Sequence, residues 1–133
     1  MPPPSDETGP GSSWAKFVLG LLEPEFAPML SPTQYIRLLG MDAESLARNA
    51  RVSVSAITMT PGAARIQSHI RENLRVIRAA YDVSDGDLPK ALYWFRTEQL
   101  PPFSQKTAEQ AVAAGRADDV IRLISSFYAG AAG

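Results

Sequence analysis

The chain has 133 residues, of which 45% are hydrophobic and 20% are charged, a composition typical of one folded soluble domain. It contains no cysteine and a single histidine, which excludes disulfides, cysteine-bound zinc and any site built from two histidines. The longest apolar stretch runs for six residues from Phe17 to Leu22, whereas a membrane helix needs about 20. The first 13 residues lack the basic and apolar segments of a signal peptide, so we expect a cytoplasmic protein without membrane contact.

The net charge of −1 conceals a basic middle segment. Residues 1–30 carry a net charge of −3 and residues 79–133 carry −2. Residues 31–78 hold seven arginines against three acidic residues, which gives them a net charge of +4. A basic segment between two acidic ones is typical of a polyanion-binding module whose neighbours have other roles.

The N-terminal 30 residues are predicted to be an arm followed by one short helix. Met1–Ser13 is rich in proline, glycine and serine, which predicts disorder. Apolar residues then recur at helical spacing and predict an amphipathic helix that ends before Pro24. These apolar residues are Trp14, Phe17, Val18, Leu21 and Leu22. Glu23–Leu30, with two prolines, is expected to be an extended link.

From residue 31 onward every segment has helical periodicity and none alternates like a strand, so the predicted fold class is all-α. Three short helices are predicted first, each with a polar N-cap: Ser31 to Gly40, Asp42 to Ala50, and Ser53 to Pro61. The longest helix is expected to cover residues 63–81. Its buried stripe would be Ile66, Ile70, Leu74, Ile77 and Tyr81. The arginines of this helix lie off the stripe and would either form a solvated face or contact a polyanion. They are Arg65, Arg71, Arg75 and Arg78.

Three more helices are predicted in the C-terminal part. The first covers residues 88–97 and ends before Pro101-Pro102. Thr107 and Gln110 form a capping box for the second, which Gly115 ends. The third covers residues 118–129 and would end at Gly130, with its inward face formed by Val120, Leu123, Ile124 and Phe127.

A helix-turn-helix is predicted around residue 51. In that motif a small residue lies where the two helices cross, and aliphatic residues five and ten positions later pack between them. Ala47, Val52 and Ile57 have this spacing. The turn position before the aliphatic needs a positive φ and is Arg51 here, a strained choice compared with glycine. A pair of short packed helices without a nucleic-acid role has the same pattern and remains an alternative.

The second helix of the motif would offer only hydroxyls and methyl groups to a DNA groove. It lacks Arg, Lys, Asn and Gln, so bidentate contacts to guanine or adenine are excluded and weak base discrimination is expected. Phosphate contacts would come from the arginines around the motif. The candidate DNA-binding residues are Arg48, Arg51, Ser53, Ser55, Thr58 and Arg65.

The C-terminal block carries a family resemblance. Four segments follow one another in the order of a known domain. They are Ala91-Leu92-Tyr93-Trp94-Phe95, the proline-containing link, the Thr107-capped helix ending in Ala114-Gly115-Arg116, and Asp119-Val120-Ile121-Arg122-Leu123-Ile124. This block, residues 88–130, resembles the toxin-binding domain of the Xre/MbcA/ParS antitoxins, and the helix-turn-helix lies where the Xre-like part of that family lies. It departs from the family at Pro101–Gln105, where a glycine-rich loop is usual, and at Ala108-Glu109, where Pro-Leu is usual.

The resemblance implies three parts: residues 1–30 as arm and helix, 31–83 as the Xre-like helix-turn-helix domain, and 84–133 as the toxin-binding domain, joined by the long helix. It implies an antitoxin that blocks a RES-domain toxin, an enzyme that consumes NAD or transfers ADP-ribose from it, and that represses its own operon. Expected partners are the toxin, operator DNA and a second copy of the chain. We choose candidate toxin contacts among the aromatic and arginine residues, which dominate protein interfaces, and in the small C-terminal tail. The candidates are Tyr93, Trp94, Arg96, Pro101, Arg122, Tyr128 and Gly133.

Three consecutive aromatics on one helix cannot all face one core, because neighbouring residues lie 100° apart. Trp94 or Phe95 is expected to pack against Ile124, with Tyr93 on the surface. Phe127 and Tyr128 are also neighbours on one helix, so Phe127 is expected to face inward and Tyr128 outward.

No catalytic set is recognisable, and we expect neither an enzyme nor a bound cofactor or metal. His69 has no identifiable nucleophile or carboxylate beside it. The aspartates at 82, 85 and 87 do not have the spacing of a calcium loop. The alternative to an antitoxin is a stand-alone helix-turn-helix regulator whose C-terminal helices only dimerise.

Overall fold

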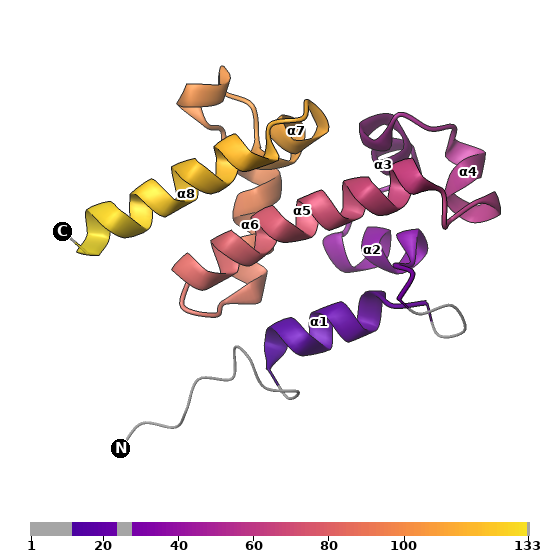
Figure 1. Ribbon diagram of the computed structural model, residues 1–133, viewed down its shortest axis with the longest axis horizontal. Coiled ribbons are helices and arrows are strands. Elements are labelled where there is room, and N and C mark those ends of the chain that lie inside the picture. The colour runs from indigo at the N-terminus through magenta and orange to yellow at the C-terminus, as the bar shows by residue number, and fades with distance from the viewer. Residues whose placement is uncertain (1–11, 24–27, 133) are drawn as a thin grey trace.

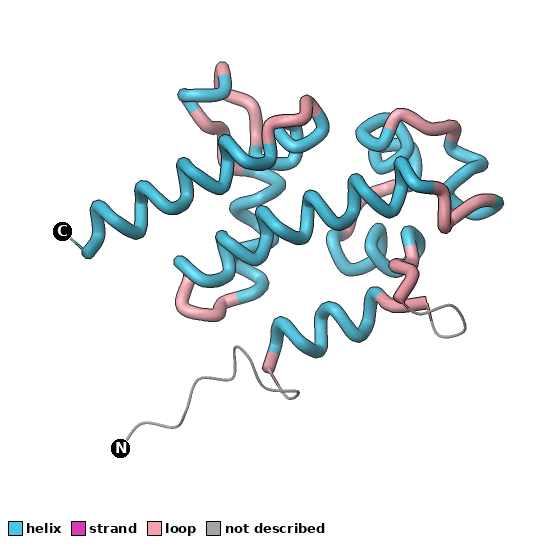
Figure 2. The backbone as a smooth tube through the Cα atoms, viewed as in Figure 1, coloured by secondary structure: helices cyan, strands magenta, loops and turns pink. Residues whose placement is uncertain are grey.

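The computed structural model describes residues 12–23 and 28–132, with side chains as far as residue 127. Every regular element in these residues is a helix, so the all-α prediction is confirmed, and short loops join the helices (Figure 2). None of the described helices is long and apolar enough to cross a membrane. The elements are α1 (Ser13–Leu21), α2 (Pro32–Leu39), α3 (Ala43–Ala50), α4 (Val54–Met59), α5 (Ala64–Val83), α6 (Leu88–Thr97), the 3-10 turn η1 (Pro101–Phe103), α7 (Ala108–Ala113) and α8 (Ala117–Ala132).

The N-terminal helix is anchored earlier than the sequence predicted. Ser12, within the predicted arm, is buried, and its side-chain oxygen accepts a hydrogen bond from the Ala15 amide at 2.9 Å. The preceding part of the arm lies outside the described residues. After α1, Leu22 and Leu30 pair as an antiparallel bridge, so the two ends of the predicted extended link lie side by side.

Local capping signals determine most helix boundaries. The Ser31 hydroxyl accepts from the Gln34 amide at 3.2 Å, and Gly40 ends α2 with a φ of 68°. The capping box of Thr107 is formed in full, and Gly115 follows α7 with a φ of 82°. These boundaries confirm the prediction, because each cap satisfies backbone groups within four residues of itself.

Helix α5 lies at the centre of the fold. In Figure 1 it crosses the molecule, with α2, α3 and α4 around its N-terminal part and α6, α7 and α8 along its remaining length. Four of the five predicted stripe residues are buried, and Leu74 is half-buried. Val76, Ala80 and Asn73 are buried as well, because helices cover α5 on more than one side. The predicted domain boundary at residue 83 stays a prediction, since α5 packs against helices that precede residue 83 in the chain and against helices that follow it.

Two buried amides tie α5 to the N-terminal helices. Gln67 accepts from the Leu30 amide at 2.9 Å and donates to the carbonyl oxygens of Leu30 and Pro61, both at 2.8 Å. Asn73 donates to the Tyr35 hydroxyl at 2.8 Å. Because buried polar groups are costly without partners, these bonds favour one placement of α2 on α5.

Of the three consecutive aromatic residues of α6, Phe95 is the one that fills the core, and Tyr93 lies on the surface as predicted. Phe95 is fully buried, Trp94 is half-buried and Tyr93 is 73% exposed. Ile124 and Val120 of α8 are buried in the same core.

Two predictions about α8 are wrong. Phe127 was expected to face inward but is 50% exposed, because α5 ends at Val83 and leaves the last described turns of α8 without a full covering helix. Gly130 was expected to end α8, yet the helix continues to Ala132. A glycine costs a helix only about 1 kcal/mol relative to alanine, and the neighbouring alanines favour continuation.

Candidate functional site

Helices α3 and α4 pack through the three residues singled out by their spacing. Ala47 is 2% exposed, Ile57 is 1% exposed, and Val52 is half-buried against the core. Arg51, between the helices, has a φ of 61°, as the motif predicts for this turn position. The Val52 amide donates to the Ala47 carbonyl at 3.0 Å and closes the turn. Two short helices thus pack against each other across a tight turn at Arg51.

The candidate recognition helix α4 presents a surface of hydroxyls and apolar groups. Ser53, Ser55 and Thr58 are exposed, together with Val54 and Met59, which is 78% exposed. Ser53 is the N-cap residue, but its hydroxyl does not cap the helix and lies 3.2 Å from the hydroxyl of Ser55. These side chains are therefore available to contact a partner.

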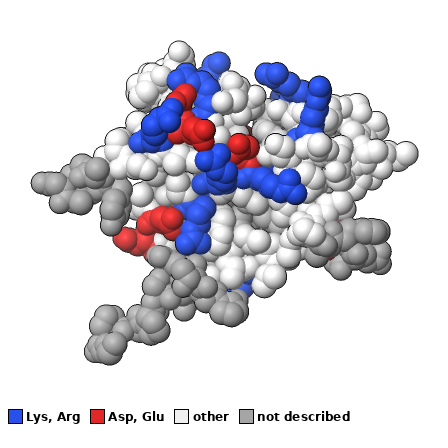
Figure 3. All heavy atoms as spheres, in the orientation of Figure 1, with Lys and Arg blue, Asp and Glu red and all other residues white. Residues whose placement is uncertain are grey.

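The three predicted phosphate-binding arginines are exposed around α3 and the start of α5. No acidic side chain in the described part of the chain forms an ion pair with Arg48, Arg51 or Arg65. Arg65 donates from Nη1 to the carbonyl of Arg51 at 3.2 Å. In Figure 3, basic side chains over the α3 end of the visible face stand apart from the acidic ones, which lie toward α8 and the rest of α5.

Two arginines farther along α5 differ because they have acidic partners. On α5, Arg75 pairs with Glu72 at 2.6 Å and with Asp118 at 2.8 Å, and Arg78 pairs with Asp82 at 3.0 Å. Arg78 also lies over the rings of Trp14 and Tyr81. Of the four arginines predicted on the solvated face of α5, Arg75 and Arg78 are therefore ion-paired, whereas Arg65 and Arg71 form no ion pair with the described residues.

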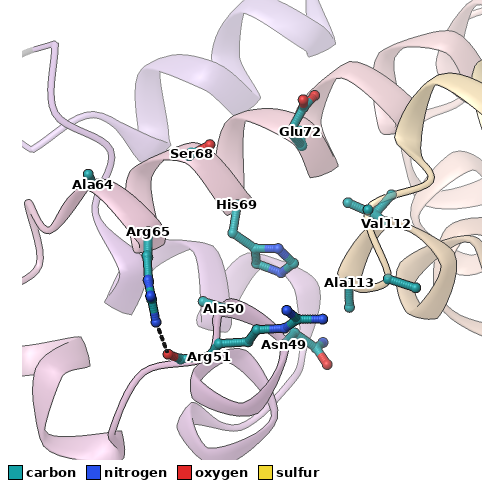
Figure 4. Close-up of a pocket in the computed structure, with 12 residues that line it drawn as sticks. Asn49, Ala50, Arg51, Ala64, Arg65, Ser68, His69, Glu72, Val112 and Ala113 are labelled. Atoms are coloured by element: carbon teal, nitrogen blue, oxygen red, sulfur yellow. Dashed lines mark hydrogen bonds between the residues drawn. The ribbon is translucent and has the colours of Figure 1, made fainter.

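A groove separates α3 and the start of α5 from α7. Its volume is about 720 Å³, and Figure 4 shows Arg51 and Asn49 from α3 and its turn opposite His69 of α5, with Ala113 of α7 at one side. A second hollow of about 370 Å³ continues from it and adds Arg48, Lys106 and Gln110 to the lining. Lys106, Asn49 and Ser68 were not predicted as site residues, because no local spacing relates side chains from three separate elements.

His69 lines this groove and belongs to a hydrogen-bonded chain that reaches the core. The Nδ2 of Asn73 lies 3.1 Å from His69 Nε2 and also donates to Tyr35. Because this amide nitrogen is a donor, Nε2 accepts and the imidazole is neutral. Burial lowers the pKa of His69, and burial also raises the pKa of Tyr35, so both groups stay uncharged near neutral pH.

Lowering the pH below 6.5 is expected to destabilise the protein through His69. The folded-state pKa lies below the ordinary value of 6.5, so the unfolded chain takes up a proton that the folded chain does not. The free energy of unfolding therefore falls as the pH falls from 6.5 toward the lowered pKa. Chemical denaturation between pH 7 and pH 5 should show a smaller decrease for His69→Gln than for the unchanged protein. Equal decreases in the two proteins would contradict this linkage.

The described members of the predicted toxin-contact set differ in exposure and partners. Tyr93 and Pro101 are exposed, and the Arg122 side chain, 73% exposed, pairs with Asp119. Hydrogen bonds from Arg116 and Arg122 lower the pKa of Asp119. The Tyr128 side chain and Gly133 lie outside the part that the structure describes.

Arg96 of α6 contacts two neighbouring helices, and its predicted contact with a toxin stays a prediction. Its Nη1 donates to the carbonyls of Leu39 at 2.9 Å and Gly40 at 3.1 Å, the C-terminal end of α2. Its Nε lies 3.4 Å from Oε2 of Glu109 on α7, whose side chain is 12% exposed. Burial raises the pKa of Glu109, and the charge of Arg96 opposes this rise. One guanidinium thus connects α2, α6 and α7.

Half-buried Trp94 lines a small apolar cavity at the opposite end of α5 from α4. The cavity has a volume of about 80 Å³ and lies between the ends of α5, α6 and α8. Val83 and Phe127, both exposed, line its rim together with Lys90. We call this surface the apolar end.

Comparison with known proteins identifies no relative: no family model, no curated protein and no solved structure matches the chain.

Proposed function

We propose that the protein is an antitoxin that represses its own operon through α3 and α4 and blocks a RES-domain toxin with its C-terminal helices. The single observation that carries the DNA-binding part is the packing of Ala47, Val52 and Ile57 beneath exposed, unpaired arginines. Unpaired cations around an exposed short helix favour a polyanionic partner, since DNA affinity depends mainly on phosphate neutralisation.

The chemistry of α4 favours weak sequence discrimination by one copy of the chain. Its exposed hydroxyls and methyl groups make no bidentate contacts to base edges. Useful repression would therefore require two or more copies on repeated half-sites, either as a homodimer or bridged by the toxin.

The toxin-binding part rests on the resemblance of residues 88–130 to the antitoxin domain, and the apolar end supports it. Exposed aromatic and aliphatic side chains around a cavity are typical of protein interfaces. Phe127, Val83 and Trp94 meet there, and Figure 1 shows α8 continuing away from α3 and α4. The two surfaces lie at opposite ends of α5, so DNA and toxin would not compete for space.

Arg51→Gly is expected to raise stability and lower DNA affinity at the same time. Glycine adopts the φ of 61° without strain, which should stabilise the protein by about 1 kcal/mol. The lost phosphate contact should reduce the slope of log affinity against log salt by about 0.9. Thermal unfolding and fluorescence anisotropy with duplex DNA measure the two effects. Unchanged DNA affinity in a stabilised variant would exclude Arg51 from the interface.

Coexpression with the protein encoded beside this gene, which the proposal expects to be a RES-domain toxin, tests the antitoxin proposal directly. A complex that purifies, and cell growth restored by this chain, are the expected results. The alternative, a stand-alone regulator, uses the apolar end for dimerisation. A stable dimer that Phe127→Ser converts to monomer, with no effect on a coexpressed RES protein, would favour that alternative.

A further inference from the structure

We infer that the groove between α3, the start of α5 and α7 binds the DNA phosphate backbone beyond the helix-turn-helix, with Lys106 as its outermost cation. This inference rests on the proposed DNA binding and extends it to a surface of the C-terminal helices. It gives Lys106, which precedes α7 in the predicted toxin-binding part, a role in DNA binding.

The groove is continuous with the candidate DNA surface. Its larger hollow begins at Arg65 and Arg51, and its smaller hollow ends at Lys106 and Gln110. The two hollows share Asn49, Arg51, Ala113 and Ala114 in their linings. A phosphate backbone that contacts Arg51 at the helix-turn-helix would therefore meet a continuous depression leading toward α7.

The charge of the lining is strongly one-sided. Arg48, Arg51 and Lys106 form no ion pair among the described residues. The one acidic residue in the described lining, Glu72, pairs at 2.6 Å with Arg75, which also pairs with Asp118. In the free protein the positive charges along the groove repel one another. A bound polyanion would offset this repulsion, because its negative charges would lie between the cations.

The remaining lining favours a backbone over a base or a small apolar ligand. Neither hollow is lined by Phe, Tyr or Trp, and the one ring in the described lining, the imidazole of His69, is hydrogen-bonded to Asn73, so base stacking has little platform. Asn49, Ser68 and Gln110 supply neutral donors of the kind that contact phosphate oxygens. On the α7 side the lining consists of the end of α7 and the turn after it, where the small residues Ala113, Ala114 and Gly115 leave room for a wide backbone to approach. We therefore assign the groove to duplex DNA.

The test compares Lys106→Gln with Lys16→Gln on the full chain. Both lysines are exposed and without an ion pair in the described residues, but Lys16 lies on α1, away from the groove. The probe is a fluorescent duplex of about 30 base pairs, roughly three helical turns, titrated at several salt concentrations. Lys106→Gln should lower the log–log slope by about 0.9 and the affinity at 0.1 M salt by roughly eightfold. Lys16→Gln should change neither.

Arg65→Gln, at the helix-turn-helix, separates the two hypotheses. If Arg65→Gln reduces the slope and Lys106→Gln does not, the groove assignment is wrong and the proposed DNA binding stands. If the unchanged protein shows no salt-dependent duplex binding, both are wrong. Binding of inorganic pyrophosphate that Lys106→Gln abolishes, with an unaltered duplex slope, would assign the groove to a free anion and overturn the inference.

Discussion

Arg96→Ala is expected to lower the free energy of unfolding by about 3 kcal/mol, because it removes one partner of a largely buried ion pair. Glu109, 12% exposed, would keep a carboxylate without a cation, and the carbonyls of Leu39 and Gly40 would lose their donor. Urea denaturation at pH 7 measures the change.

Two further variants distinguish a packing role for Arg96 from a toxin contact. Arg122→Ala breaks an exposed pair and should cost less than about 1 kcal/mol. Adding Glu109→Gln to Arg96→Ala should recover part of the loss, since a neutral amide costs less to bury than an unpaired carboxylate. If Arg96→Ala unfolds like the unchanged protein but fails to neutralise the toxin, the original assignment of Arg96 as a toxin contact is right.

Deletion of residues 129–133 is expected to abolish or strongly weaken toxin neutralisation while the melting temperature changes little. The buried residues of α8 lie before this segment, at Ala117, Val120 and Ile124, so the deletion removes none of the described core. The segment consists of alanine and glycine alone, and under the proposed antitoxin function its small size would suit a narrow cleft of the toxin. Growth of cells that coexpress the toxin measures neutralisation, and DNA affinity serves as a control that should not change.

The substitution Tyr128→Ala tests whether the aromatic residue just before this segment contributes to the stability of the complex with the toxin. Loss of an aromatic anchor from the centre of an interface costs about 2 kcal/mol or more of complex stability, measurable by calorimetry with the purified toxin. Full neutralisation by the truncated chain would instead place the blockade at the α6 aromatics and the Pro101-Pro102 turn.

The amino-acid sequence by itself determined the helices and most of their boundaries. Ser31, Asp42 and Thr107 accept hydrogen bonds from amides three residues ahead, and Gly40 and Gly115 adopt positive φ. These interactions are complete within about one helical turn, so residue type and spacing suffice to predict them. The positive φ of Arg51 was predictable for the same reason.

Only the tertiary structure decided which side chains share a surface. Arg96 has the sequence environment of a surface arginine, and its packing role arises because α2 ends beside α6 and α7. Phe127 continues the apolar pattern of α8, yet it is exposed because α5 ends at Val83. Arg51, His69 and Lys106 come to one groove from elements far apart in the chain. Such convergence depends on how helices pack, and helical periodicity reports only which face of a helix is buried, not what that face meets.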